Sequence, residues 1–350
     1  MNSQFEYKSA MDGLRFTDEQ KRRIAERAAA VAAQKPRRTR RPVARAILVA
    51  ACVAAVLVVS AGATGVLKTA VESFAGIFGG EAAQTEVIDK IGRPIGASAT
   101  DNGVTISADA IIGDEYNAAI VFTIRRDDGQ PLLPEGTDMS SLLLGGIGGT
   151  DLNILGGSHG SLWFTDEDPG DNAIQLVQTI SSDISIPGHT ATAEFGDICA
   201  WDNETGEKFS LIEGHWKFRF DVDYEDSSVI LGGGETFAQD GMTFTIDEVR
   251  VSPVAVRVAY TVDSEIQWSD APSGRLNEQD RESQRRYFEN VEILLTRTDG
   301  TVMAAPTGGS IKPGDGRTVC VRGGVLDEII PLEELESISV GGIVYPISVH

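Results

Sequence analysis

The feature that most constrains this chain is an uncharged run of 22 residues, from Ala46 to Leu67. As an α-helix the run would be about 33 Å long, at roughly 1.5 Å per residue. That length matches the roughly 30 Å hydrocarbon core of a bilayer. Backbone groups in lipid must find hydrogen-bond partners within their own segment, which favours a helix. The run therefore predicts one transmembrane helix, placed at residues 45–67.

Two other interpretations of the run are open. One is a buried helix of a soluble protein, although core helices of this length seldom lack charge all round. The other is a cleavable signal peptide, because Ser60 to Ala63 resembles a small-residue cleavage site. However, 45 residues precede the run, and its length exceeds the usual signal core of about 7–15 residues. An uncleaved span is the interpretation we favour.

The charges on either side of the run predict its orientation. Residues 1–45 hold 12 Lys+Arg and 5 Asp+Glu, a net charge of +7, whereas residues 68–350 hold the other 18 Lys+Arg and 47 Asp+Glu, a net charge of -29. Basic residues beside a span stay in the cytoplasm, so the acidic remainder is predicted to be extracytoplasmic. A nucleic-acid patch is the competing interpretation of the basic cluster, but its contact with the apolar run argues against direct nucleic-acid binding. The cations predicted to hold the tail at anionic lipid headgroups are Lys35, Arg37, Arg38, Arg40, Arg41 and Arg45.

The tail, residues 1–44, is predicted to hold a short cytoplasmic helix. Thr17 and Gln20 have capping-box spacing, and strong helix formers follow until Pro36. A segment this small cannot bury large side chains in a core of its own. These side chains either belong to a disordered, solvated end or dock on a cytoplasmic partner and fold as they bind. The candidate partner-binding residues are Phe5, Tyr7, Met11, Leu14, Phe16 and Ile24.

An internal repeat organises the remainder of the chain. Residues 103–124 match residues 241–262 without a gap at an offset of 138, mainly through shared alternation of apolar and polar residues. Each copy predicts two strands, joined near Gly113–Asn117 or near Ser252–Pro253. A glycine-containing turn, ending at Gly103 or Gly241, precedes each copy.

Two copies at this offset predict two domains of ordinary size, 99–225 and 226–350. The alternating segment His215–Val222 closes the first domain, and Ile338–Ile347 forms the last strand pair of the second. Strands without long intervening helices favour two β-sandwiches, so the fold class is mainly β. Residues 68–98 are predicted to be a juxtamembrane linker, in which Val71–Phe78 forms a short helix at the membrane surface.

The residues offer no catalytic, cofactor or metal site. There is no phosphate-binding G-x-x-x-x-G-K and no G-x-S-x-G elbow, and Ser158 beside His159 is interpreted as a polar loop. The acidic stretch 166–171 is interpreted as a solvated loop rather than a weak calcium site. We therefore expect a protein that is not an enzyme and that uses no cofactor. Cys199 and Cys320 would both lie outside the cytoplasm, where a disulfide bond and two free thiols are equally compatible with the sequence.

These parts together resemble a known family. A short basic tail, one span and then D-N-G-V-T-I-S-A-D-A-I-I-G-D-E-Y-N-A-A-I-V-F-T-I, residues 101–124, are similar to bacterial membrane proteins of domain-of-unknown-function family 4179. Residues 5–24 resemble the amino ends of those proteins, and residues 241–262 resemble the immunoglobulin-like domain that often follows. The resemblance implies an anti-sigma factor that pairs with an extracytoplasmic-function sigma factor. This chain lacks the His/Cys zinc motif of the zinc-binding anti-sigma group.

The leading hypothesis is therefore a single-pass membrane regulator. Its tail would bind a sigma factor, and its exterior domains would sense an envelope signal or shield a cleavage site near residues 68–98. A membrane-anchored surface adhesion or wall-binding module suits the same domains, because fold alone does not decide function. A surface hydrolase is the weakest alternative, since no constellation of residues supports it.

Overall fold

The computed structural model describes residues 69–348, except 147, 154–155, 167, 169–170, 203–204 and 271–276. The predicted cytoplasmic helix and the predicted span, residues 45–67, lie outside the described residues. Within the described residues, no helix is both long enough and apolar enough to cross a membrane. Strands predominate there, so the prediction of a mainly β fold is confirmed. All the described residues belong to one compact unit, Val59–His350.

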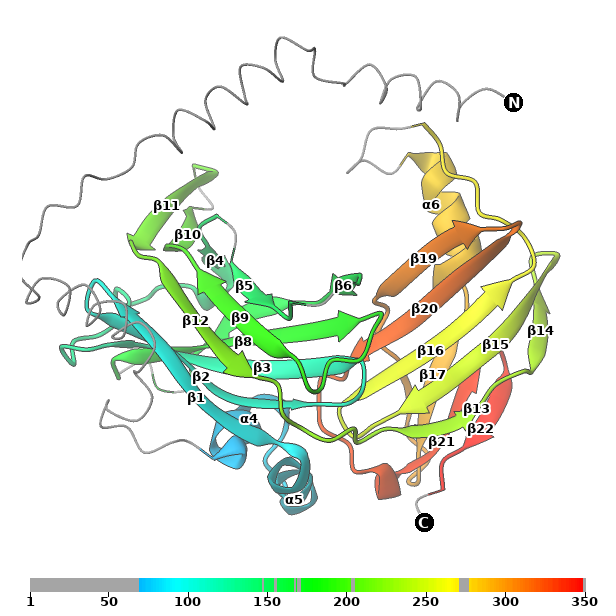
Figure 1. The fold of residues 1–350 in the computed structure, drawn as a ribbon, viewed down its shortest axis with the longest axis horizontal. Coiled ribbons are helices and arrows are strands. Elements are labelled where there is room, and N and C mark those ends of the chain that lie inside the picture. The colour runs from blue at the N-terminus through cyan, green and yellow to red at the C-terminus, as the bar shows by residue number, and fades with distance from the viewer. Residues whose placement is uncertain are drawn as a thin grey trace, which may run out of the picture. The chain divides into compact units, whose positions relative to one another are not determined.

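A first β region, residues 93–224, packs three sheets around one core (Figure 1). The strand orders are β1-β2-β3-β8-β6 with β7 also paired to β8, then β11-β10-β4, and then β12-β9-β5. The strands are β1 (Arg93–Asp101), β2 (Val104–Gly113), β3 (Asn117–Arg126), β4 (Leu142–Leu144), β5 (Gly149–Asp151), β6 (Ser158–His159), β7 (Leu162–Thr165), β8 (Ala173–Ser182), β9 (Thr190–Phe195), β10 (Ile198–Asp202), β11 (Glu207–Ile212) and β12 (Trp216–Asp221). A short 3-10 helix, η1 (Met139–Ser141), precedes β4.

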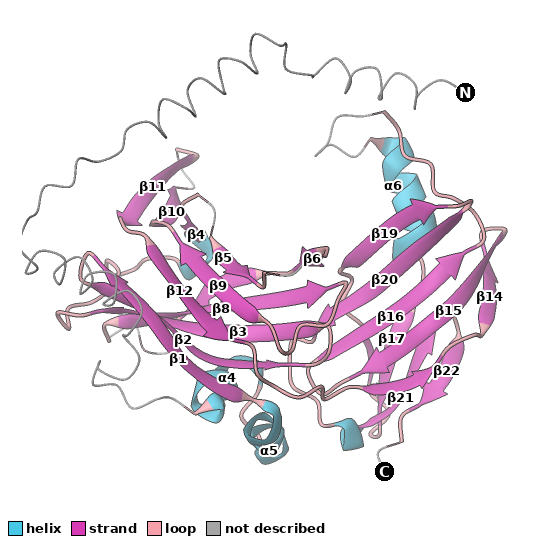
Figure 2. Cartoon of the chain, viewed as in Figure 1, coloured by secondary structure: helices cyan, strands magenta, loops and turns pink. Residues whose placement is uncertain are grey.

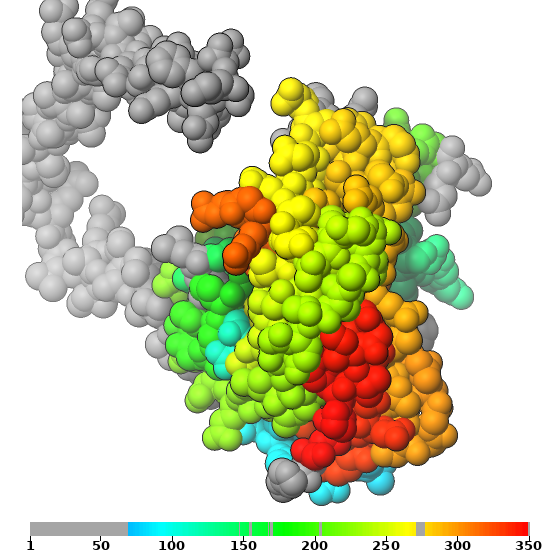
Figure 3. Space-filling model, turned by 90° about the vertical axis from the view of Figure 1, so that its right-hand side faces the viewer, coloured from blue at the N-terminus to red at the C-terminus, as the bar shows by residue number. Residues whose placement is uncertain are grey.

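A second β region, residues 229–348, packs two sheets around a separate core. Their strand orders are β13-β15-β16-β20-β19 with β14 also paired to β15, and β18-β17-β21-β22. The strands are β13 (Val229–Gly232), β14 (Thr236–Gln239), β15 (Met242–Val251), β16 (Ala255–Val262), β17 (Ile293–Arg297), β18 (Val302–Ala304), β19 (Gly309–Gly314), β20 (Arg317–Val325), β21 (Leu335–Val340) and β22 (Ile343–Pro346). The predicted last strand pair is β21 and β22. In Figure 3 these red strands lie against the yellow-green segment of β13 and β14, where Tyr345 donates to Glu235 at 2.8 Å.

The predicted repeat is present as two hairpins, β2–β3 and β15–β16. The two-residue turn before each hairpin has positive φ at both positions, Asn102–Gly103 in one copy and Asp240–Gly241 in the other. Such turns match the twist of antiparallel strands, and glycine adopts them without strain. In each hairpin the register shifts at the same point of the repeat, beside Asp109 in the first copy and beside Asp247 in the second.

The hairpin β2–β3 is buried on both faces, which explains its nearly continuous apolar sequence. Ile120 and Phe122 of β3 face the first core, whereas Ala119 and Val121 face a third apolar cluster. By contrast, β12 alternates strictly, with Trp216 and its alternate neighbours buried as predicted and the residues between them exposed. A strand buried on both faces needs apolar residues at every position, whereas a strand with one solvated face needs them only at every second position.

Two helices cover the second face of β2 and β3: α4 (Ala70–Phe78) and α5 (Ala82–Ile91) (Figure 2). Thr69 begins α4 with a capping box, in which its hydroxyl accepts from the Glu72 amide while the Glu72 carboxylate accepts from the Thr69 amide. Phe74 and Phe78 of α4 and Ile88 of α5 are buried in the third cluster.

This arrangement corrects the prediction for residues 68–98. The helix predicted at Val71–Phe78 exists, but its apolar face packs on protein, so that face is not available to a membrane surface. The residues after it form α5 and most of β1, which starts before the predicted domain boundary at 99. The linker prediction was therefore wrong for the described part of this segment. Two further elements were not predicted, α6 (Glu278–Gln284) and the π-helical η2 (Arg285–Glu289). A further 3-10 turn, η3 (Leu332–Glu334), leads into β21.

Candidate functional site: the junction of the two β regions

The junction between the two β regions is centred on a buried carboxylate, Asp114, in the short loop between β2 and β3. Its side chain accepts from the backbone amides of Tyr116 and Asn117 at 2.9 and 2.8 Å, and from the Asn117 side chain at 3.0 Å. These three bonds all reach Oδ1 and fix the loop. The other oxygen, Oδ2, accepts a hydrogen bond at 2.8 Å from Ser252 of the second β region. One carboxylate thus shapes a loop and joins two regions of the chain.

Ser252 occupies the same position in the second copy of the repeat as Asp114 does in the first, 138 residues earlier. It lies in the loop between β15 and β16 and is fully buried. Its hydroxyl oxygen accepts from the Ala255 amide at 2.9 Å while the hydroxyl group donates to Asp114. The equivalent loops of the two copies therefore contact each other directly.

The segment that connects the two β regions is fastened to the same loop. The Tyr224 hydroxyl lies 3.1 Å from the carbonyl oxygen of Asp114, and Ser227 donates to the carbonyl oxygen of Gly113 at 3.0 Å. Asp226 accepts from the Glu115 amide at 3.0 Å. Because its side chains bond to the β2–β3 loop, this connection does not behave as a free tether between domains.

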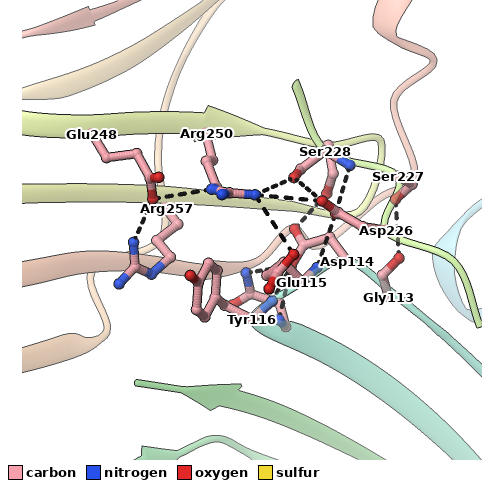
Figure 4. A network of polar contacts seen from close by, with 12 residues as sticks. Gly113, Asp114, Glu115, Tyr116, Asp226, Ser227, Ser228, Glu248, Arg250 and Arg257 are labelled. Carbon is pink, nitrogen blue, oxygen red and sulfur yellow. Dashed lines mark hydrogen bonds and ion pairs between the residues drawn. The ribbon is translucent and has the colours of Figure 1, made fainter. Parts of the chain in front are cut away.

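A charged cluster borders the buried pair on the side of the second β region (Figure 4). Arg250 of β15 lies 3.0 Å from the Glu248 carboxylate and 3.4 Å from Asp226. Arg257 of β16 donates to Glu248 at 2.8 Å, and its guanidinium lies 4.1 Å from the centre of the Tyr116 ring. Contacts of this kind between a cation and an aromatic face contribute about 0.5–2 kcal/mol, more when water is excluded.

A further contact between the two regions lies at β19. Lys312 donates to Asp183 at 2.6 Å, and Ser310 donates to the same carboxylate at 3.2 Å. The Lys312 side chain is more than half exposed, so this ion pair contributes little stability on its own. The ion pair helps to orient the two β regions but adds little to the stability of the junction.

The electrostatics of the centre follow from burial. Burial raises the pKa of Asp114 above its usual range, although the hydrogen bonds from Ser252, Tyr116 and Asn117 oppose that rise. Burial also raises the pKa of Tyr224 well above its usual value, and the nearby Asp114 charge adds to the effect. The Ser252 hydroxyl and the Asp114 carboxylate are both buried, and the hydrogen bond between them joins the two β regions.

The sequence-predicted residues stand apart from this junction. The tail residues Phe5 to Ile24 and the cations Lys35 to Arg45 lie outside the described residues. Cys199 and Cys320 are both buried and free, and Cys320 belongs to the core of the second β region, so the free-thiol interpretation agrees with the structure and the disulfide interpretation does not. Burial raises the pKa of the Cys320 thiol to about 12, which keeps this thiol protonated and unreactive.

Other sequence features gain no chemical role from the structure. Ser158 and His159 form the edge strand β6 rather than a loop, and both are exposed. Within the described part of the chain, no group of three or more His, Cys, Asp or Glu is placed to hold a metal ion.

The sequence patterns do not identify Asp114, Ser252 and Arg250 as junction residues. The available signal was their place in the repeat, because polar residues stand at equivalent loop positions of two otherwise apolar hairpins. That signal identifies the two loops but not their contact with each other.

Comparisons with known proteins identify one segment of this chain. Residues 38–126 match the family described as "Domain of unknown function (DUF4179)", so the resemblance inferred from the sequence is confirmed for these residues. The matched segment includes α4, α5 and β1 to β3, and it ends at the last residue of β3. None of the curated proteins matches the chain.

Among solved structures, a chain described as the conserved domain protein from Bacillus anthracis is 18% identical to this one. The similarity covers 69% of this chain and 73% of that chain, with a TM-score of 0.43. A likeness at this level supports no conclusion about fold or function.

Proposed function

We propose that the chain is a single-pass membrane regulator, an anti-sigma factor whose cytoplasmic tail binds an extracytoplasmic-function sigma factor. In this proposal, residues 45–67 cross the membrane with the amino end inside. The two β regions are immunoglobulin-like sandwiches outside, and they sense an envelope signal. The observation that carries the proposal is the uncharged run of 22 residues, which separates a tail of net charge +7 from an acidic remainder of net charge -29.

The family match and the junction support the proposal in different ways. The match at residues 38–126 includes most of the basic cluster, the whole predicted span and the first half of the junction. The junction joins the two β regions through the Asp114–Ser252 bond and through the fastened connection at Tyr224. Coupled regions can pass a change in one part to the other, which a sensor requires, because the energetic coupling between sites is carried by contiguous contacts.

Co-purification tests the proposal directly. The full chain is expressed in turn with each extracytoplasmic-function sigma factor of its host and is captured from solubilised membranes. We expect capture of the sigma factor by the wild type and at least about tenfold weaker capture by Phe5→Ala/Phe16→Ala, because truncating central aromatic contacts typically costs more than 1 kcal/mol each. Phe209→Ala, which alters an exposed aromatic residue of β11, is the matched control and should bind normally. Absence of capture by the wild type contradicts the proposal.

A membrane-anchored adhesion or wall-binding module remains the second candidate. Trp201 and Phe209 favour it, because they are 46% and 48% exposed on the β10–β11 hairpin, and exposed aromatic residues are common in binding surfaces. The two candidates differ in their use of the tail. Replacing residues 1–34 with an unrelated basic sequence abolishes the activity of an anti-sigma factor and leaves that of an adhesion module intact.

A further inference from the structure

A short segment of the second β region, Leu326–Pro331, closes the carboxyl end of α4. The last carbonyl groups of a helix have no partner within the helix and need one elsewhere. Phe78 is the last residue of α4, and its carbonyl oxygen accepts from the Ile329 amide at 2.9 Å. The carbonyl oxygen of Ile329 in turn accepts from the Gln84 side chain of α5 at 3.1 Å. One residue of the second region therefore holds both helices.

The same segment is seated on the loop that contacts Asp114. The amide of Leu326 donates to the carbonyl oxygen of Val254 at 2.8 Å, and the amide of Ile330 donates to that of Pro253 at 2.9 Å. Ser252, the next residue of that loop, donates to Asp114. Hydrogen bonds made by neighbouring residues of the 252–254 loop and the 326–331 segment thus link the junction centre to α4 and α5.

The apolar contacts follow the same route. The third cluster contains Phe74 and Phe78 of the helices, residues of β2 and β3, and Val254, Ala255 and Ile329 of the second region. Helices of nine and ten residues are too short to be stable alone in water, because isolated helices below about 12–15 residues are marginal. The folding of α4 and α5 therefore depends on the surfaces that cover them, and part of that cover belongs to the second β region.

We infer that the 326–331 segment controls the folding of α4 and α5, so that displacing the second β region unfolds the chain next to the predicted span. The inference rests on the proposed function for its membrane context, because only a span before residue 69 makes this stretch juxtamembrane. It supplies the regulatory step that the proposal leaves open. A signal that alters the seating of the second region changes the exposure of the backbone at residues 70–91. That exposed backbone is then open to an endoprotease or to another chain.

Hydrogen exchange of the full chain in detergent micelles tests this inference. Ile329→Pro removes the amide that closes α4, and Ser252→Asp places a second carboxylate against Asp114 and disfavours the seated position. We expect exchange over residues 70–91 to accelerate at least about tenfold in both variants, whereas amides of β3 and β16 stay within about threefold of wild type. Gln84→Ala should give a smaller acceleration confined to α5. The matched controls, with the same changes at exposed positions, are Ser210→Asp and Gln130→Ala.

Two results overturn the inference. One is wild-type exchange over residues 70–91 in both Ile329→Pro and Ser252→Asp. The other is an equal acceleration in β3 and β16, which indicates general unfolding instead of a local effect. Neither result bears on capture of the sigma factor by the tail, so failure of the inference and failure of the proposed function can be told apart.

Discussion

At the scale of single residues, three of the four identities shared by the two repeats have a structural reason. Gly103 and Gly241 both hold positive φ in the turn that opens their hairpin. Asp109 and Asp247 both mark the register shift, and each accepts a hydrogen bond from a threonine of the next strand, at 2.5 Å in the first copy and 2.7 Å in the second. The two copies share identical residues where backbone geometry is fixed, whereas at the apolar positions they share only an apolar side chain and not its identity.

The two copies of this Asp–Thr bond differ in burial, which makes them a matched pair for mutation. Asp109 is buried and Asp247 is exposed. Asp109→Ala leaves the Thr123 hydroxyl without this partner in a dry site, so we expect a loss of about 1–3 kcal/mol in the free energy of unfolding. Asp247→Ala should lose less than about 1 kcal/mol, since water replaces the lost partner. Denaturant unfolding followed by tryptophan fluorescence measures both, and equal losses would contradict the explanation.

The buried carboxylate of Asp114 predicts a pH dependence with a definite sign. Its folded-state pKa is raised by burial above the value near 3.8 expected in the unfolded chain. The folded state therefore binds the proton more tightly, and this contribution to stability is present at low pH and is lost as the pH rises through the raised pKa. Asp114→Asn cannot titrate, and its amide oxygen can still accept from the loop amides.

The free energies of unfolding of wild type and Asp114→Asn, measured from pH 4 to pH 8, test this sign. We expect the wild type to lose stability relative to the variant as the pH rises, and to reach a constant difference above the raised pKa. Parallel curves, or a relative gain of stability by the wild type, would show that burial does not dominate at this site.

At the scale of elements, α4 shows what a linker prediction overlooks. The sequence of residues 70–78 is apolar enough for a membrane surface, but Phe74 is fully buried against protein. Substituting a buried phenylalanine by alanine typically costs 3–5 kcal/mol. We therefore expect Phe74→Ala to lower the free energy of unfolding by about 3–5 kcal/mol, whereas Phe209→Ala, half exposed on β11, should change it by less than about 0.5 kcal/mol. A tolerated Phe74→Ala would restore the linker interpretation.

Local patterns predicted the hairpins well because their cause is local. Alternation in β12 and a two-residue turn ending at Gly241 depend on neighbours in sequence, so the sequence alone indicates them. The junction depends on where distant segments meet. Asp114 and Ser252 are ordinary loop residues until the fold brings them within 2.8 Å. Likewise, the nearly continuous apolar sequence of β3 indicates a strand, but it does not indicate which elements cover the second face of that strand.

At the scale of the whole molecule, the acidic remainder and the basic tail of the proposed topology impose different requirements. Residues 68–350 carry a net charge of -29, which disfavours contact with anionic headgroups, whereas each lysine or arginine near such a surface contributes about 1 kcal/mol of attraction. In the proposed topology, the lysine and arginine residues beside the span orient it during insertion. The basic cluster lies outside the β regions in sequence, so in the proposed topology their placement outside the cell depends on residues 35–45.

This dependence gives a prediction that is independent of the sigma factor. Removing cations beside a span weakens the retention of that end in the cytoplasm, while acidic residues contribute little to orientation. With Arg37, Arg38, Arg40 and Arg41 replaced by glutamine, we expect a smaller fraction of chains with the carboxyl end exported, measured with a reporter fused after His350. Removing the same number of cations far from the span should leave orientation unchanged, and the matched control is Arg281→Gln/Arg285→Gln/Arg286→Gln/Arg317→Gln. Only positive charges near the span are expected to act on insertion, so equal effects of the two sets of substitutions would indicate that total charge determines orientation. A reporter found in the cytoplasm for the wild-type chain would exclude the proposed topology.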